Sequence, residues 1–351
     1  MMHPRAAALL GAAGLLLAGT GACAPAAPRS ATVVFSGPTM GTTFTVKVVP
    51  GPGGLTSDER QVIDDGIRDL LARIDRQIST WRNDSDLARF NESESLDPVP
   101  FGPEAFALFE QAVAVATFTG GAVDVTVAPV VDAWGFGPHG QADIAPDEAT
   151  LKALEASVGV DKLVVDPASR TVAKRHPRVR CDFSALAAGY AADRVAAFLE
   201  ARGHRDFLVD MSGELVARGF NEAGEPWRVA IERPRAATRS ILRVVPLTDM
   251  AVSTSGAYRN YREVEGRRVT HILDPRTRRP VTHYLASVTV IAPSAAWADA
   301  LSTALMVMGP DEGAAFAARH DVAALFVVPD VDGEFRERPS PAFTAWLSGK
   351  S

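Results

Sequence analysis

The chain has 351 residues, of which 47% are hydrophobic and 22% are charged. This composition is that of an ordinary globular protein with a large core, and it excludes disorder of the whole chain. The 36 basic and 42 acidic residues give a formal net charge of −6, so the chain lacks the basic excess expected of a nucleic-acid-binding protein.

The N-terminus has the pattern of an export signal. Arg5 precedes the apolar run AAALLGAAGLLLAG, which is too short to span a bilayer stably but has the length of a signal-peptide core. Small residues then precede Cys23, as in a bacterial lipoprotein cleavage box, and we expect Cys23 to carry the lipid anchor. A plain secreted protein cleaved nearby is the alternative. We therefore predict a signal peptide over residues 1–22, a tether over 23–31 and one folded domain over 32–351.

The first part of the domain mixes strands and helices. Two short strands are expected on either side of residues 37–42, and a helix is expected to begin at Ser57. The motif STWRNDSDLARFN follows, in which Trp81 is either a stacking platform for a planar ligand or a core or rim aromatic. A further helix, PEAFALFEQAVAVATFTGG, stops at its two glycines.

Two carboxylates stand out in the middle of the chain. Asp124 lies between apolar neighbours and needs a hydrogen-bonded partner, so it is either a structural turn ligand or a contact to a bound base. A short helix over residues 147–157 and a hairpin around Asp166 come next. Asp182 is expected to end a strand, before a small-residue helix over residues 185–202 whose N-terminus suits phosphate. No GxxxxGKT pattern is present, which argues against a P-loop site.

The last part of the chain contains the densest group of polar side chains. Strands are expected at DFLVDMSGELVARG, EPWRVAIERP and ILRVVPL, and the apolar runs AVSTSG and THILDP are expected to be strands that stop at a functional rim. SVTVIAP is a further strand, followed by a helix capped by Ser294, a second helix at PDEGAAFAARH and a buried strand at VAALFVVPD.

Asp299 and Thr303 are four residues apart on the helix after Ser294, so their side chains lie on one face. A carboxylate and a hydroxyl presented together suit a hard cation such as Mg²⁺, which takes oxygen ligands. The alternative is that Asp299 favours the positive end of its helix and Thr303 bonds back to a backbone carbonyl, with no metal.

Together and in this order, these motifs resemble the ApbE family, the FAD:protein FMN transferases. The resemblance covers the chain from about Thr32 to about Val328 and implies an α+β fold of two interwoven β-α-β modules with a flavin cleft between them. The motifs that carry it are MGT, STW with SDLARFN, GGAVDVTVAPVVDAWGFG, DFSALAAGYAADRV, SGEL, TSGAYRNY, THILDPRTRRPV and ADALSTALMVMG.

The resemblance implies a lipid-anchored bacterial enzyme that faces the periplasm and uses Mg²⁺. Such an enzyme moves the FMN half of FAD onto a threonine hydroxyl of a partner protein and releases AMP, and the partner is a flavin-carrying subunit of a membrane redox complex. The metal site would fall on the side chains of Asp299 and Thr303 and the backbone carbonyl of Ala185. The FAD contacts would be Met40, Trp81, Ala122, Val123, Asp124, Asp182, His271 and Ile272.

Two departures and two alternative functions accompany the resemblance. Ala188 and Ala257 stand where many family members have polar residues, so each removes a polar contact.

His271 is the candidate base for the acceptor proton, and the alternative is that it only stacks or hydrogen-bonds beneath the flavin, with Asp274 ordering the turn. An FAD pyrophosphatase with water as acceptor, or a flavin-binding lipoprotein with no chemistry, are the other functions left open.

Overall fold

The computed structural model describes residues 30–139, 145–235, 240–257, 261–264, 267–332 and 334–349. The expected signal peptide, Cys23 and most of the expected tether lie outside these residues, as do residues 258–260 of the TSGAYRNY motif. None of the described helices combines the length and the apolar character that crossing a bilayer requires.

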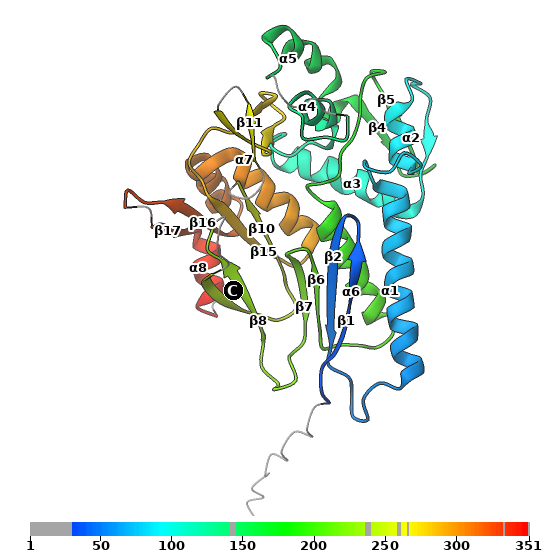
Figure 1. The fold of residues 1–351 in the computed structure, drawn as a ribbon, viewed down its shortest axis with the longest axis vertical. Helices are drawn as coiled ribbons and strands as arrows, with labels where there is room; N and C mark the ends of the chain where they lie inside the picture. The colour runs from blue at the N-terminus through cyan, green and yellow to red at the C-terminus, as the bar shows by residue number, and fades with distance from the viewer. Residues whose placement is uncertain are drawn as a thin grey trace, which may run out of the picture.

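One antiparallel sheet of eight strands organises the fold (Figure 1). Its strand order is β1-β2-β6-β7-β10-β15-β16-β17, so strands from both ends of the chain share one sheet. The α+β class expected from the sequence is confirmed, and the finer division into two interwoven modules stays a prediction. The strands are β1 (Val33–Thr39), β2 (Thr42–Val48), β6 (Phe207–Met211), β7 (Glu214–Arg218), β10 (Ala251–Gly256), β15 (Ser287–Ala292), β16 (Ala323–Pro329) and β17 (Phe335–Pro339).

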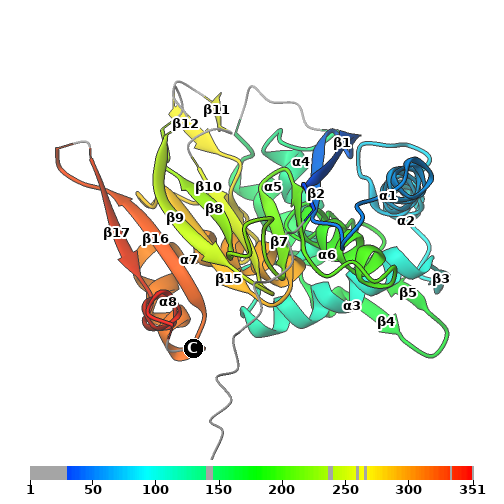
Figure 2. The same cartoon turned by 90° about the horizontal axis from the view of Figure 1, so that it is seen from below.

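Three helices cover one face of this sheet: α1 (Ser57–Ile78), α6 (Ala187–Glu200) and α7 (Ala295–Arg319) (Figures 1 and 2). Their apolar sides meet alternate residues of the strands, such as Phe44 and Val46 of β2, in the main hydrophobic core. The expected core face of α1 is buried except at Val62, which is 56% exposed because it lies on the solvent side of the helix.

The opposite face of the sheet is covered only in part. A hairpin of β8 (Trp227–Glu232) and β9 (Ile241–Leu247), together with α8 (Pro341–Leu347), packs on it and forms a second apolar core. That core joins side chains of β8 and β9 to Val252 of β10 and Leu325 of β16. The face of β2 and β6 on this side is left without such a cover, and residues such as Thr45 and Asp210 stay half-buried there.

A smaller lobe lies above the end of the sheet in Figure 1. It lies around the end of β10, where the polar motifs converge. Its elements are α2 (Asp86–Glu92), α3 (Pro103–Phe118), α4 (Ala128–Ala133), α5 (Glu148–Leu154), the three-stranded sheet of β3 (Val99–Pro100), β5 (Thr171–Lys174) and β4 (Leu163–Asp166), and the short hairpins of β11 (Tyr261–Val264) with β12 (Arg267–Thr270) and β13 (Leu273–Asp274) with β14 (Arg279–Pro280).

Two expectations about strands were wrong. Asp182 does not end a strand, because the backbone N–H and carbonyl of Cys181 bond to the side chain of Asn91, at 2.7 and 2.8 Å, and no neighbouring strand takes their place. The THILDP run is also broken. Thr270 ends β12 and Leu273–Asp274 forms β13, because the chain bends at His271, where the N–H of Ile272 bonds back to the hydroxyl of Thr270.

The backbones of α6 and α7 touch at Gly189. A Cβ atom at this position would lie 2.3 Å from the carbonyl oxygen of Ala295 in the first turn of α7. One turn further along α6, Asp193 accepts hydrogen bonds from the N–H groups of Ala295 and Ala296, at 2.8 and 2.9 Å, and so caps α7. The two helices are therefore fixed to each other by a direct backbone contact at Gly189 and by the side chain of Asp193.

We expect Gly189→Ala to lower the free energy of unfolding by about 1–3 kcal/mol, the usual cost of forcing extra volume into a packed contact. The cause is that the new methyl group must push α6 away from α7. Urea denaturation would measure the change, and Gly51→Ala is the control, because no heavy atom lies within 4 Å of a Cβ placed at Gly51. A Gly189→Ala variant as stable as the control would contradict this account of the contact.

Candidate active site

A cavity of about 390 Å³, here called the central cavity, opens between the end of β10 and the part of α7 that carries Asp299 and Thr303. It brings together residues from six separate parts of the chain, and nine of the eleven expected ligand and metal residues line it. These nine are Ala122, Val123, Asp124, Asp182, Ala185, His271, Ile272, Asp299 and Thr303.

The other two expected residues, Met40 and Trp81, line an adjoining cavity of about 200 Å³, here called the side cavity. Asp182 and Ser184 line both cavities, so the two are continuous. Trp81 is 70% exposed, which excludes a core role and leaves its ring at the rim. Ala188 also lines the side cavity, where its methyl group offers no polar contact.

Two tight turns form one rim of these cavities. Met40 and Gly41 have φ values of 46° and 74° in the turn between β1 and β2, and Ser212 and Gly213 have φ values of 62° and 112° in the turn between β6 and β7. Turns with two positive φ values match the twist of a β-hairpin. The hydroxyl of Thr42 donates to that of Ser212 at 2.8 Å, so the two turns are joined.

Asp299 enters the central cavity from α7 and is 6% exposed. Its Oδ2 accepts a hydrogen bond from the N–H of Gly189 at 3.1 Å. Gly189 is the third residue of α6, and the N–H groups of a helix's first turn have no acceptor within the helix, so the carboxylate of Asp299 supplies one. Ala185 precedes α6 and lines the central cavity, so its carbonyl lies outside the hydrogen-bond pattern of the helix.

A chain of hydroxyl groups orients Thr303. The Oγ atom of Ser255, near the end of β10, lies 3.1 Å from Oγ1 of Thr303 and 2.8 Å from Oγ of Ser302. Ser302 in turn donates to the backbone carbonyl of Asp299 at 3.0 Å. The sequence placed Ser255 in a strand that stops at the site, but its contact with Thr303 could not be foreseen from spacing.

Two carboxyl groups near these hydroxyls, those of Asp299 and Glu214, have raised pKa values. Burial raises the pKa of Asp299 well above its usual range, and the neighbouring carboxylate of Glu214 raises it further. Burial likewise raises the pKa of Glu214 from its ordinary value of 4.5 to about 7, and Asp210 adds to the shift. A cation placed here would reverse both shifts by favouring the charged carboxylates.

The donors present fit a hard cation. Among the described residues there is no group of three or more His, Cys, Asp or Glu side chains placed to hold a metal. The available set is instead one carboxylate, one hydroxyl and one backbone carbonyl, from Asp299, Thr303 and Ala185. Oxygen-only sets of this kind suit Mg²⁺, which usually keeps waters and substrate phosphate oxygens in the rest of its shell.

Asp124 and Asp182 differ in how many of their carboxylate oxygens accept hydrogen bonds from the protein itself. The carboxylate of Asp124 accepts hydrogen bonds from the N–H and hydroxyl of Thr126, at 2.8 and 2.6 Å, and from the N–H of Val160 at 2.6 Å, so both of its oxygens hold the loop together. Asp182 binds Ser184 through Oδ1, and burial raises the pKa of Asp182. Asp182 is thus the better placed of the two to meet a ligand.

His271 lies at the bend between β12 and β13 and lines the central cavity, with the ring of Phe136 edge-on at 6.5 Å between centroids. Asp274, nearby, accepts hydrogen bonds from the backbone and the guanidinium of Arg276 at 2.9–3.2 Å. Asp274 therefore orders the turn that carries His271, as the sequence analysis allowed.

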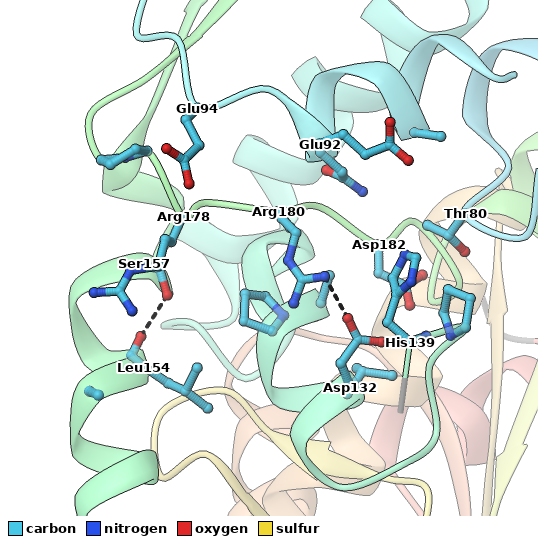
Figure 3. Close-up of a pocket in the computed structure, with 18 of the residues that line it drawn as sticks. Thr80, Glu92, Glu94, Asp132, His139, Leu154, Ser157, Arg178, Arg180 and Asp182 are labelled. Carbon is cyan, nitrogen blue, oxygen red and sulfur yellow. Dashed lines mark hydrogen bonds and ion pairs between the residues drawn. The ribbon is translucent and has the colours of Figure 1, made fainter. Parts of the chain in front are cut away.

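The largest of these cavities, about 580 Å³ and here called the third cavity, was not foreseen from the sequence (Figure 3). It lies between α2, α4, α5 and residues 177–182, and it meets the central cavity at Asp182 and Val131. Arg180 points across it and forms an ion pair with Asp132 at 2.7 Å. Asp182 thus stands at the junction of all three cavities.

Comparisons with known proteins agree with this arrangement. The model of the ApbE family matches residues 40–326. The chain is 39% identical over 316 residues to the FAD:protein FMN transferase of Vibrio cholerae, covering 90% of this chain and 93% of that protein. It is 38% identical over 346 residues to that of Klebsiella pneumoniae, covering 98% and 97%. The crystal structure of Pseudomonas stutzeri flavinyl transferase ApbE, in its apo form, matches with a TM-score of 0.82 at 39% identity and covers 92% of this chain and 98% of that chain.

We expect Glu214→Gln to flatten the dependence of stability on pH in the presence of EDTA. The wild-type pKa is higher in the folded state, so the unfolded state releases its proton first and stability falls as pH rises from about 4.5 through 7. Between pH 5 and pH 8 the variant should gain about 2 kcal/mol relative to the wild type. Urea denaturation at both pH values measures this difference, with Glu110→Gln on the exposed side of α3 as control. An unchanged slope in Glu214→Gln would contradict the assigned burial of this carboxylate.

Proposed function

Because the chain belongs to the ApbE family, we propose that it transfers the FMN half of FAD to a protein acceptor. The observation that carries this conclusion is the central cavity, which gathers nine of the residues expected to contact the flavin nucleotide or its metal from distant parts of the sequence. In this reaction a bond forms between the acceptor oxygen and the phosphorus of the FMN half. The bond from that phosphorus to the AMP half breaks.

The two continuous cavities accommodate an extended dinucleotide. Met40 and the exposed ring of Trp81 offer a surface for one planar ring system in the side cavity. The backbone of Ala122 and Val123, together with His271 and Ile272, lines the central cavity for the rest of the molecule. Asp182, at the junction, can accept a hydrogen bond from a ring N–H or a ribityl or ribose hydroxyl.

Asp299, Thr303 and the carbonyl of Ala185 hold Mg²⁺ in this proposal. When bound, the ion neutralises charge on the diphosphate and on the departing AMP. The protein contributes the placement of its oxygen ligands: Gly189 fixes the carboxylate of Asp299, and Ser255 fixes the hydroxyl of Thr303. Fixed ligands lower the barrier because they need not reorganise during the reaction.

The acceptor group is a threonine hydroxyl on a flavin-carrying subunit of a membrane redox complex. His271 takes its proton, because an imidazole titrates near neutral pH and this one lines the same cavity as the metal ligands. A lipid on Cys23 and the tether to residue 31 hold the domain at the periplasmic side of a membrane, within reach of such a subunit.

Incubation of the protein with FAD, Mg²⁺ and the apo form of a soluble flavin-carrying domain tests the transfer. We expect a fluorescent covalent flavin on that domain in a denaturing gel, together with release of AMP, and no label in EDTA. Asp299→Asn should lower the rate by about 10²-fold or more, because it removes the carboxylate ligand of the proposed Mg²⁺ site. Each 1.36 kcal/mol of lost transition-state stabilisation lowers the rate tenfold. Asp311→Asn, on the exposed end of α7, is the matched control.

The same experiment separates the other two functions. Free FMN and AMP without a labelled acceptor would identify an FAD pyrophosphatase. Stoichiometric FAD binding that ignores EDTA and yields no AMP would identify a flavin-binding protein, and either result would contradict the proposed transfer.

His271→Gln tests the proton acceptor. It keeps a hydrogen-bonding side chain but removes the basic nitrogen, so we expect the single-turnover rate of transfer to fall by about 10²–10⁴-fold and its pH dependence near neutrality to disappear. FAD affinity, measured by fluorescence titration, should change much less. A variant that binds FAD weakly but keeps its single-turnover rate would show that His271 positions the flavin and takes no proton.

A further inference from the structure

We infer that the acceptor polypeptide reaches the active site along a groove between strand β8 and the uncovered face of the large sheet. This inference rests on the proposed function, because only a protein acceptor needs such a route. The groove has a volume of about 570 Å³ and is here called the acceptor groove. Its lining includes Thr45, Lys47, Asp210, Glu214, Arg228 and Ala230.

The register of the sheet builds the floor of this groove. Thr45 pairs with Asp210, Asp210 pairs with Leu215, and Leu215 pairs with Val252. Directly paired residues project to the same face, so these four form a row across β2, β6, β7 and β10. The row begins under the β8–β9 hairpin at Val252 and ends at the uncovered Thr45.

Strand β8 forms the wall. Five successive residues, 228 to 232, line the groove, although their side chains alternate between the core and solvent. The edge of the strand itself therefore borders the groove. Within the described residues β8 pairs only with β9, so its other edge can add an extended segment as a further strand.

The groove joins the central cavity at Ser212 and Thr254, which line both. Thr254 directly precedes Ser255, whose hydroxyl contacts Thr303. A segment lying in the groove therefore meets the central cavity at the end of β10, one residue before Ser255.

The third cavity offers a less suitable route (Figure 3). It meets the central cavity at Asp182 and Val131, whereas the acceptor groove meets it at Ser212 and Thr254, next to Ser255 in the chain. A polypeptide in the third cavity would arrive next to the Arg180–Asp132 ion pair.

The chemistry of the acceptor groove suits the main chain of an extended segment. Thr43 and Thr45 offer hydroxyls, and the lining includes charges of both signs, from Lys47, Arg228, Asp210 and Glu214. A wall and floor of this kind bind peptide N–H and C=O groups and favour neither a strongly acidic nor a strongly basic segment. The occupant is thus the extended stretch of the acceptor protein that carries the threonine near one end.

Ala230→Trp and Thr45→Trp test the groove, because both residues line it and an indole is much larger than either side chain. With the apo flavin-carrying domain as acceptor, we expect KM for that domain to rise at least tenfold in both variants. KM for FAD and FAD affinity should stay within twofold of the wild type. Val62→Trp on the exposed side of α1 is the control for adding a surface indole.

Photo-crosslinking provides a second measurement that does not depend on filling the groove. A benzophenone side chain placed at position 230 should crosslink to the acceptor domain, and one at position 150, in the third cavity, should not. Crosslinking from 150 and not from 230, or an unchanged KM in both tryptophan variants, would overturn the inference while leaving the proposed function intact. Release of FMN by the wild type with no labelled acceptor would overturn both.

Discussion

The backbone contact between α6 and α7 is the constraint on which the site depends. At Gly189 the two helices are too close for any side chain, and this closeness lets the N–H of Gly189, in the first turn of α6, reach the carboxylate of Asp299. One hydrogen bond therefore fixes the orientation of Asp299 and satisfies a donor at the start of α6 that has no partner within its own helix. Asp193, which caps α7 from α6, keeps the helices in the same relation at the next turn.

Around this contact the fold places acidic groups where they lower stability. Asp299 is buried and Glu214 is half-buried, and the carboxylate of Glu214 makes ionisation of Asp299 harder. Natural proteins break rules of stable packing mainly at functional sites, and the surrounding apolar core offsets the cost. Here the core of α6, α7 and the sheet supplies that stability, and a divalent cation would favour the charged forms of these carboxylates.

The sequence predicts well where the argument is local. Residues close together in the sequence are enough to predict three features: the apolar spacing of α1, the tight turns of β1–β2 and β6–β7, and the four-residue spacing of Asp299 and Thr303. It fails where a distant group decides the outcome. Asn91 takes the backbone bonds of Cys181 and prevents the strand expected before Asp182. The position of Ser255 beside Thr303, and the groove between β8 and the sheet, likewise follow from the order of strands in the sheet, which composition and periodicity do not specify.

The break in α7 has a mechanical consequence. Gly309, with a φ of 81°, and Pro310 divide the helix, and the ring of His283 bonds the carbonyl of Met306 at 2.8 Å just before the break. The segment that carries Asp299 and Thr303 is thus clamped at its start by Asp193 and at its finish by His283. A helix segment held at one end only can still rotate about its axis or slide along it, whereas a segment held at both ends cannot. Movements of the part of α7 after Gly309, or of the surface loops around it, therefore do not rotate or shift the side chains of Asp299 and Thr303.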